Sequence, residues 1–286
     1  MGAGILAKRY GVTREEIYTA KTIARAMLNA KKKAPKILIF DIETSPLKAY
    51  VWQRYKQNVY PDQMLSEWFM LTWSAKWLFE SKVMSDKLTA KEVKSEDDKR
   101  IVTSLWKLID EADIIIAHNG DSFDIPRMNS RFIVNGLVPP ALFKSVDTKR
   151  VAAKNFGFSS NKLSELAKYF GFEGKMDTDF ELWAKCMDGD EEALEYMRKY
   201  NDQDVILLEE IYLKLRPWIR DHPNMGLYME LDKPVCKNCG SSELTYMEKY
   251  YYTQTGRFET YRCECGAIGR RRLNSFDKDK KENLLV

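Results

Sequence analysis

The stretch KILIFDIET (residues 36–44) sets two acidic side chains inside an apolar run that follows a proline. Such an isoleucine-rich run is typical of a strand in the interior of a sheet. Residues two apart on a strand point to the same face, so Asp41 and Glu43 would lie side by side. Burying a carboxylate costs free energy unless an opposite charge or a metal ion balances it. The stretch predicts half of a divalent-cation site; the alternative is a strand that ends at Phe40, with both acids in a solvated turn.

The composition indicates a globular protein with a highly charged surface. The chain has 286 residues, of which 44% are hydrophobic and 31% charged, and a formal net charge of +4. This length allows one large domain, or a medium domain with small appendages. The modest net charge permits nucleic-acid binding without arguing for it. Because we find no apolar run that could span a bilayer and no signal-peptide core, we expect a cytoplasmic protein without a membrane partner.

The chain divides into four parts by pattern and composition. These are a helical appendage (1–34), an α/β domain (35–222), a cysteine-rich module (232–275) and a charged tail (276–286). In the appendage, Thr13 and Glu16 form a capping box after a glycine, which resembles the outline of a helix-turn-helix. Reading of DNA and a role in packing or assembly are both open for this segment.

The α/β domain shows strand patterns first and then strands that alternate with helices. Strands are predicted at 50–52, 70–77 and 113–117, a polar loop at 87–99, and helices at 101–109, 126–135, 162–170 and 191–215. Gly171 and Pro217 mark the ends of the last two helices. This order indicates an α/β domain with a mixed sheet flanked by helices.

Further acids follow the later elements. Asp124 lies in the turn after the strand at 113–117, before the predicted helix. Tyr200 and Asp204 are four residues apart in the longest helix, so they share one face of it.

Three motifs in this order resemble those of the DEDD 3'-5' exonucleases of the tyrosine branch, as in the proofreading domains of family B DNA polymerases. They are Asp41-x-Glu43, Asn119-x-x-x-Phe123-Asp124 and Tyr200-x-x-x-Asp204. The resemblance covers residues 36–218 and implies a ribonuclease H-like fold. The histidine branch would need an imidazole at position 199, which is a lysine. With the cysteine-rich tail, the sequence DIETSPL (41–47) is also similar to stand-alone proteins of bacteriophages and prophages, which implies a bacterial or phage-infected host cell.

The resemblance implies a role for each matching residue. Two Mg²⁺ or Mn²⁺ ions would bind the four carboxylates Asp41, Glu43, Asp124 and Asp204, and Tyr200 would orient the attacking water. Thr44, Asn119 and Phe123 would lie near the 3'-terminal nucleotide, although Phe123 could equally be a core residue. Other acids remain open: Asp121 and Asp202 offer alternative registers, and Asp147 could line the site, although a charged surface turn is favoured for it.

The residue types suit phosphodiester hydrolysis. Two divalent ions can activate a water and stabilise the leaving oxyanion, and both Mg²⁺ and Mn²⁺ prefer oxygen ligands. We therefore expect a metal-dependent 3'-5' exonuclease on single-stranded nucleic acid, with DNA favoured over RNA. The alternatives are a structure-selective nuclease of the same fold and a non-catalytic nucleic-acid-binding adaptor.

Two cysteine pairs near the C-terminus indicate a metal site. Cys236 and Cys239 are separated by 23 residues from Cys263 and Cys265, and the intervening pattern predicts a β-hairpin. This arrangement resembles a zinc ribbon with a structural Zn²⁺ ion. The second pair is one residue short of the usual knuckle, which strains the geometry; a reduced, metal-free hairpin is the alternative. The fifth cysteine, Cys186, is interpreted as a packing residue.

The cysteine-rich module also carries basic and aromatic residues that could bind a nucleic acid. They are Lys249, Tyr250, Tyr251, Tyr252, Phe258, Arg262, Arg270, Arg271 and Arg272. The alternative is a docking surface for a replication or repair protein, a role open to the N-terminal helices as well.

Overall fold

The computed structural model describes residues 12–13, 34–172 and 176–285. The chain forms two compact units, and we call residues 36–212 the sheet unit and the described residues from 213 onward the cysteine unit. The appendage predicted for residues 1–34 lies outside the described residues, apart from 12, 13 and 34. In the described part of the chain, no helix is long and apolar enough to cross a membrane.

The sheet unit is built on a five-stranded mixed sheet in the order β5-β4-β1-β6-β7. The strands are β1 (Ile37–Thr44), β4 (Met70–Trp77), β5 (Met84–Lys87), β6 (Ile114–Ala117) and β7 (Lys144–Asp147). The central strand β1 pairs antiparallel with β4 and parallel with β6. The predicted mixed α/β sheet is therefore confirmed, and the predicted strand at 70–77 is β4.

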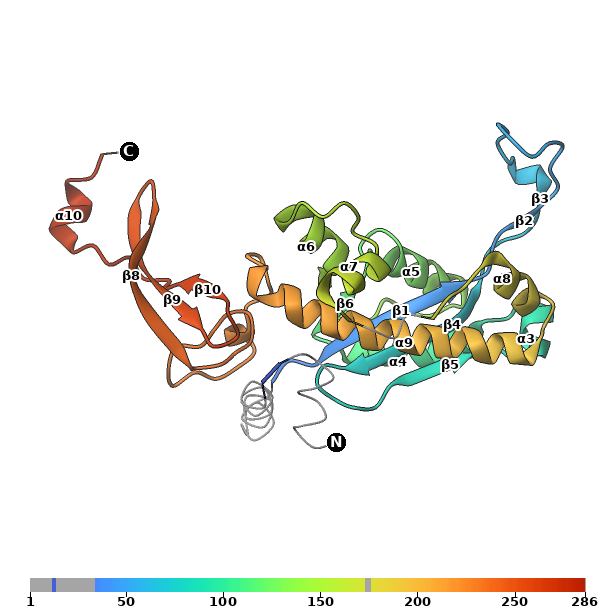
Figure 1. Ribbon diagram of the computed structural model, residues 1–286, viewed down its shortest axis with the longest axis horizontal. Coiled ribbons are helices and arrows are strands. Elements are labelled where there is room, and N and C mark those ends of the chain that lie inside the picture. Colours follow the sequence, from blue (N-terminus) through green and yellow to red (C-terminus); the bar gives the residue numbers. More distant parts are fainter. Residues whose placement is uncertain (1–11, 14–33, 173–175, 286) are drawn as a thin grey trace. The chain divides into compact units, whose positions relative to one another are not determined.

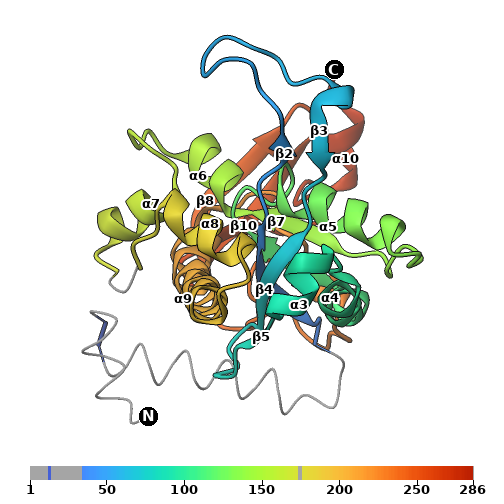
Figure 2. The same cartoon turned by 90° about the vertical axis from the view of Figure 1, so that its right-hand side faces the viewer.

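Helices cover both faces of this sheet, with α4 and α5 on one face and α9 on the other (Figure 2). The helices are α3 (Ala90–Ser95), α4 (Lys99–Glu111), α5 (Asp124–Val134), α6 (Thr148–Asn155), α7 (Leu163–Phe170), α8 (Phe180–Met187) and α9 (Glu191–Leu215). The predicted helix at 191–215 is confirmed, and Gly171 ends α7 in the left-handed conformation that favours glycine.

The two faces of β1 differ in chemistry. Leu38, Phe40 and Ile42 are buried in the core that includes α4. The alternate side chains of the strand, which include Asp41 and Glu43, point to the opposite face, where α9 lies. Because β1 continues to Thr44, both acids belong to the strand. The alternative of a strand that ends at Phe40 is wrong.

Three local predictions are wrong. Residues 50–52 are exposed and outside any strand, because no neighbouring strand gives their bulky side chains a half-buried surface. The predicted loop at 87–99 contains α3, which Thr89 caps by accepting a hydrogen bond from the Glu92 backbone amide. Helix α5 begins at Asp124, two residues before the proline expected to open it.

Between β1 and β4 the chain forms a hairpin that projects from the sheet unit (Figures 1 and 2). Its paired segments are β2 (Lys48–Ala49) and β3 (Met64–Ser66), with a 3₁₀ turn, η1 (Pro61–Gln63), just before β3. We call residues 47–66 the hairpin arm.

The cysteine unit contains a three-stranded antiparallel sheet in the order β10-β9-β8. Its elements are the 3₁₀ turns η2 (Arg216–Trp218) and η3 (Met225–Leu227), the strands β8 (Leu244–Thr253), β9 (Gly256–Cys263) and β10 (Ile268–Arg270), and the short helix α10 (Lys278–Glu282). The hairpin predicted between the cysteine pairs is thus present as β8 and β9, and part of the charged tail forms α10.

Candidate functional site

The first motif lies at the end of β1. Asp41 is half-buried, and its carboxylate accepts a hydrogen bond of 2.6 Å from the side-chain amide of Asn201 on α9. Burial raises the pKa of Asp41 well above its usual range, and the charges of Asp124, Glu43 and Asp204 raise it further. Three segments that are far apart in the sequence therefore place their acids close enough to interact electrostatically.

Asp124 is the first residue of α5 and is only 2% exposed. Its carboxylate accepts a hydrogen bond of 3.3 Å from the backbone amide of Ile42, which ties the start of α5 to β1. Burial raises the pKa of Asp124 to about 7, against the opposing effects of this hydrogen bond and of the nearby Arg127. A carboxyl group with such a pKa readily loses its proton when a cation binds to it.

The third motif lies on α9, whose apolar residues pack around it. Asp204 and Tyr200 are both buried. Burial raises the pKa of the Tyr200 hydroxyl above its usual range, with further contributions from the Asp204 and Glu43 charges and from a hydrogen bond with Asp204. The tyrosine hydroxyl therefore keeps its proton at neutral pH, next to the carboxylates.

The four carboxylates do not form one compact ligand shell. Within the described residues, the only group of three or more metal-ligating side chains whose ligand atoms all lie within 4.8 Å of one another is a set of four cysteines. The carboxylates are spread more widely, and their mutual repulsion adds to the effect of burial in raising the pKa of Asp41. A donor set of oxygen atoms with unrelieved negative charge fits hard divalent cations such as Mg²⁺ and Mn²⁺.

The three residues expected near a nucleotide lie next to these acids in the chain. The Thr44 hydroxyl accepts a 3.4 Å hydrogen bond from the Arg127 guanidinium, and the Asn119 side chain accepts a 3.2 Å hydrogen bond from Lys149. Asn119 has a φ of 69° at the turn after β6. Phe123 is half-buried and packs against the core; a contact between its exposed part and a nucleotide stays a prediction.

Arg127 was missed by the sequence analysis. It lies on α5, one turn after Asp124, and its guanidinium stacks between two aromatic rings. The distances to the ring centroids are 4.5 Å for Trp68 and 4.6 Å for Phe123. A cation held beside a group of carboxylates is suited to bind a phosphate. Residues three apart on a helix lie on the same face, so the spacing of Arg127 from Asp124 could have indicated that both side chains face the site.

The alternative acids have partners of their own. Asp121 pairs with Arg150, and Asp202 pairs with Arg198 while accepting a 2.7 Å hydrogen bond from Ser74. The interpretation of Asp147 as part of a charged surface turn is wrong. It is 5% exposed and caps α6, because its carboxylate accepts hydrogen bonds from backbone amides at the start of that helix.

Asp147 also supports the second motif. Its carboxylate accepts hydrogen bonds from the backbone amides of Asn119 and Asp121, at 3.0 and 3.3 Å, and so holds the turn that leads to Asp124. Its charge contributes to the raised pKa of Asp124. Asn201 has a comparable role on α9, where it is fully buried and orients Asp41.

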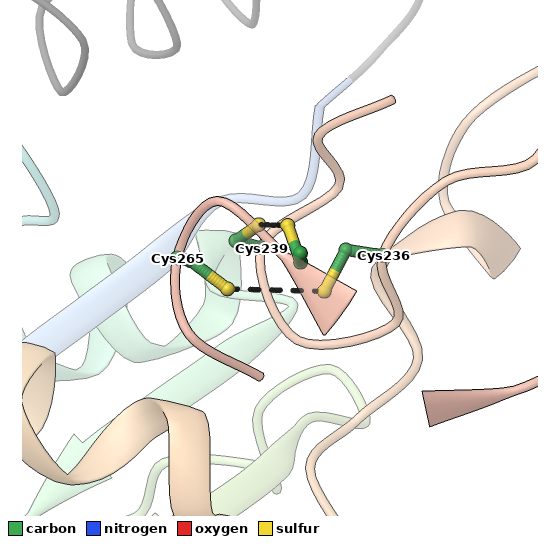
Figure 3. Close-up of side chains that lie close together, drawn as sticks. Cys236, Cys239 and Cys265 are labelled. Carbon is green, nitrogen blue, oxygen red and sulfur yellow. Dashed lines mark hydrogen bonds between the residues drawn. The ribbon is translucent and has the colours of Figure 1, made fainter. Parts of the chain in front are cut away.

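A second candidate site lies in the cysteine unit, where four cysteine sulfurs converge. Figure 3 shows Cys236, Cys239 and Cys265 pointing toward one another. The Sγ–Sγ distance is 3.9 Å between Cys236 and Cys265, and 3.6 Å between Cys239 and Cys263. Tetrahedral zinc with Zn–S bonds of about 2.3 Å has sulfurs about 3.8 Å apart. The sulfur positions therefore fit one tetrahedral Zn²⁺ ion.

Both cysteine turns close in the same way despite their different lengths. The Gly240 amide donates to the Cys236 carbonyl at 2.8 Å, and the Gly266 amide donates to the Cys263 carbonyl at 2.9 Å. Both glycines have positive φ, at 79° and 88°. The shorter second pair thus still brings its sulfurs to the cluster.

Contacts within the cysteine unit hold the first turn in place. The fully buried side chain of Asn238 donates to the carbonyls of Arg216 and Ile219, at 2.7 and 3.0 Å. Tyr261 is buried beside the sulfurs. A side chain at Gly269 would clash with it, because a Cβ there would lie 2.3 Å from the Tyr261 hydroxyl.

The sheet of the cysteine unit carries arginines that stack on aromatic rings. Arg270 lies over Phe258 at 4.1 Å and over Tyr251 at 5.4 Å, whereas Arg271 pairs with Glu259. Cys186 is in the other unit and is buried in its core, which confirms it as a packing residue.

The arrangement can be compared with known proteins. Residues 77–216 match the family model described as the RNase_H superfamily. The chain contains a ribonuclease H-like domain. The matched segment includes Asp124, Tyr200 and Asp204. Asp41 and Glu43, which lie on the central strand β1, precede the matched segment.

A solved structure of the family B DNA polymerase from the hyperthermophilic archaeon Pyrobaculum calidifontis is also similar. The TM-score is 0.48 and the sequence identity 18%, over 64% of this chain and 25% of the polymerase chain. The chain therefore spans about a quarter of the length of that polymerase. Comparison with curated proteins finds no significant match.

Proposed function

We propose that the ribonuclease H-like domain is a metal-dependent 3'-5' exonuclease that acts on single-stranded nucleic acid, with DNA favoured over RNA. The observation that carries this proposal is the environment of Asp41. Burial raises its pKa, and carboxylates from β1, α5 and α9 raise it further. Acids arranged in this way are costly for the fold, and cations that bind between them would offset the cost.

Asp41, Glu43, Asp124 and Asp204 would hold two Mg²⁺ or Mn²⁺ ions. Bound there, the ions supply Lewis-acid chemistry, which favours deprotonation of an attacking water and stabilises the departing oxygen. Hydrolysis adds the water oxygen to phosphorus and breaks the bond to the 3' oxygen. The products are a nucleoside 5'-monophosphate and a strand shortened by one nucleotide, with a free 3' hydroxyl.

We assign to Tyr200 the role of orienting the attacking water. Because its pKa is raised above the usual value, the hydroxyl remains a hydrogen-bond donor and is not a general base. Asn201 and Asp147 are positioning residues, since they act through Asp41 and through the turn before Asp124. Arg127, Thr44, Asn119 and Phe123 are assigned to the terminal nucleotide.

We further propose that Cys236, Cys239, Cys263 and Cys265 bind one structural Zn²⁺ ion. The support is the sulfur geometry together with the donor set, because four thiolates favour zinc in a closed tetrahedral site. Few hydrophobic residues surround the cluster, so metal binding would supply much of the folding free energy of this segment.

The test is digestion of a 5'-labelled single-stranded DNA and of a matching RNA, with Mg²⁺ or Mn²⁺. Wild type is compared with Asp41→Asn, and Asp121→Asn serves as the matched control because its acid pairs with Arg150 and is not among the charges that raise the pKa of Asp41. We expect a ladder that shortens from the 3' end, present in wild type and control and absent in Asp41→Asn.

The other outcomes select among the alternatives. Internal cuts would replace the exonuclease with a structure-selective nuclease. Binding without cleavage in either metal would leave a nucleic-acid-binding adaptor as the function. The substrate that is cleaved at the higher rate shows whether the enzyme prefers deoxyribose or ribose.

A further inference from the structure

The hairpin arm exposes an unusual number of aromatic side chains. Tyr50, Trp52, Tyr55 and Tyr60 all lie in its loop and are all exposed, Trp52 to 94% and Tyr55 to 79%. Exposed aromatic rings cost hydration free energy and, when several gather on one segment, mark a binding surface. The arm therefore has a composition that its own folding does not require.

The root of the arm is firmly fixed to the sheet unit. Ser45 and Phe69 are joined by two hydrogen bonds: the Ser45 amide donates to the Phe69 carbonyl, and the Phe69 amide donates to the Ser45 hydroxyl, both at 2.9 Å. The next amide, of Met70, donates to the fully buried Asp98, which Arg131 also binds with two nitrogens at 2.6 and 2.7 Å. The arm is thus presented on a rigid base.

This root adjoins the carboxylate site. Lys48 follows Glu43 by five residues, which span at most about 17 Å of extended chain. Trp68, just after the arm, stacks on the Arg127 guanidinium, which in turn donates to Thr44 and lies over Phe123. A nucleic-acid strand bound beside Arg127 would therefore lie close to the root of the arm.

The charges of the arm select the kind of ligand. The arm contains three cations and one acid. Lys48 pairs with Glu96, whereas Arg54 and Lys56 flank the exposed Tyr55. Cations that alternate with exposed aromatic rings suit a polyanion with flat, stackable groups, because phosphates bind the cations and bases stack on the rings. Lysine, of which the arm has two, is instead depleted at protein–protein interfaces.

We propose that the hairpin arm, residues 47–66, binds single-stranded nucleic acid by stacking on bases upstream of the terminal nucleotide held at the carboxylate site. That this strand is the substrate rests on the proposed exonuclease function; binding to the arm does not. Stacking on aromatic rings tolerates any sequence, because every base has a π-face. The arm would therefore favour long strands over short ones without sequence preference.

The test measures binding separately from cleavage. In an Asp41→Asn background, the affinity for a 5'-fluorescein-labelled 20-nucleotide DNA is measured by fluorescence anisotropy, with and without the double change Trp52→Ala/Tyr55→Ala. We expect the double change to raise Kd at least about 10-fold, with an unchanged melting temperature because both side chains are exposed. Trp218→Ala, which removes a 60%-exposed indole of the cysteine unit, is the matched control and should leave Kd unchanged.

Cleavage is then measured with Asp41 intact. The Trp52→Ala/Tyr55→Ala protein should hydrolyse the p-nitrophenyl ester of thymidine 5'-monophosphate as fast as wild type, since this small substrate cannot reach the arm, while KM for the 20-nucleotide strand rises. An unchanged Kd for that strand would overturn the inference. So would an equal loss on both substrates, or a change in self-association by light scattering in place of a change in Kd. If wild type binds through the arm and cleaves nothing, the inference stands and the exonuclease function fails.

Discussion

The carboxylate site and the cysteine cluster bring like groups together in two different ways. The carboxylates come from β1, α5 and α9, and the sheet unit that holds them has a large core of its own. The cysteines come from two short turns, and few buried apolar residues surround them. An ion at the first site would relieve repulsion in a structure that is already folded, whereas an ion at the second would hold the segment together. A metal ion at the carboxylate site would thus serve the chemistry, and a metal ion at the cysteine cluster would serve folding.

The sharpest test of this difference is Asp41→Asn. We expect the exonuclease rate to fall by at least about 10³-fold, because one carboxylate ligand is lost. The metal-free protein should melt at the same temperature or higher, since a repelling charge is removed. Initial rates and calorimetry measure the two effects. A variant that loses activity because it unfolds would break the comparison.

Cys239→Ser should have the opposite profile. Structural zinc sites contribute on the order of 10 kcal/mol to folding, so we expect loss of bound zinc and loss of hydrogen-exchange protection across β8 and β9. The sheet unit should keep its own melting transition. Zinc content and exchange measured by mass spectrometry check this, with Cys186→Ala as the control that retains one zinc. Intact protection in Cys239→Ser would show that this sheet folds without the ion.

Tyr200→Phe removes only a hydroxyl from the carboxylate site. We expect kcat to fall about 10- to 100-fold, while the increase in melting temperature caused by millimolar Mg²⁺ is retained. The raised pKa of Tyr200 also means that wild type should lose no activity from ionisation of this tyrosine up to pH 10. Unchanged turnover in Tyr200→Phe would remove the assigned role.

The pH dependence of the metal-free sheet unit tests its internal repulsion. The folded-state pKa of Asp124 is about 7 and that of Asp41 is also raised, whereas unfolded aspartates titrate near 4. Between these values the folded state binds more protons, so stability falls as the pH rises from about 4 to 7. We expect the melting temperature to fall by on the order of 5 °C across this range. Mg²⁺ should restore it at pH 8, and Asp41→Asn should reduce the fall.

The smallest effect concerns the sheet of the cysteine unit, for which nucleic-acid binding remains a proposal. Arg270→Ala should weaken binding of a single strand a few-fold and reduce the slope of log K against log salt by about 1. Arg271→Ala is the matched control, because Glu259 already neutralises this arginine. Salt titrations of both variants measure the difference. Equal effects would point to a general loss of charge, and no effect would favour a protein-docking surface.

Patterns that depend on neighbouring residues could be predicted from the sequence. The apolar run of β1, the long pattern of α9 and the spacing of the cysteines are all local, and each predicted its element or cluster. The contacts of Asn201, Asp147 and Arg127 could not be derived in this way, since each side chain meets a segment that is distant in the sequence. The strand predicted at 50–52 failed for a related reason: bulky residues form a strand only where another strand and a buried surface receive them.

The paired hydrogen bonds between Ser45 and Phe69 separate the hairpin arm mechanically from the strands that precede and follow it. If the loop at residues 50–60 were lengthened or shortened, the structural effect would stop at this junction. The register of β1 against β4 would stay intact. A single residue inserted within β1 would instead turn its acids into the core. The arm is therefore a natural acceptor position for grafted loops, which could be exchanged without altering the strand that carries Asp41 and Glu43.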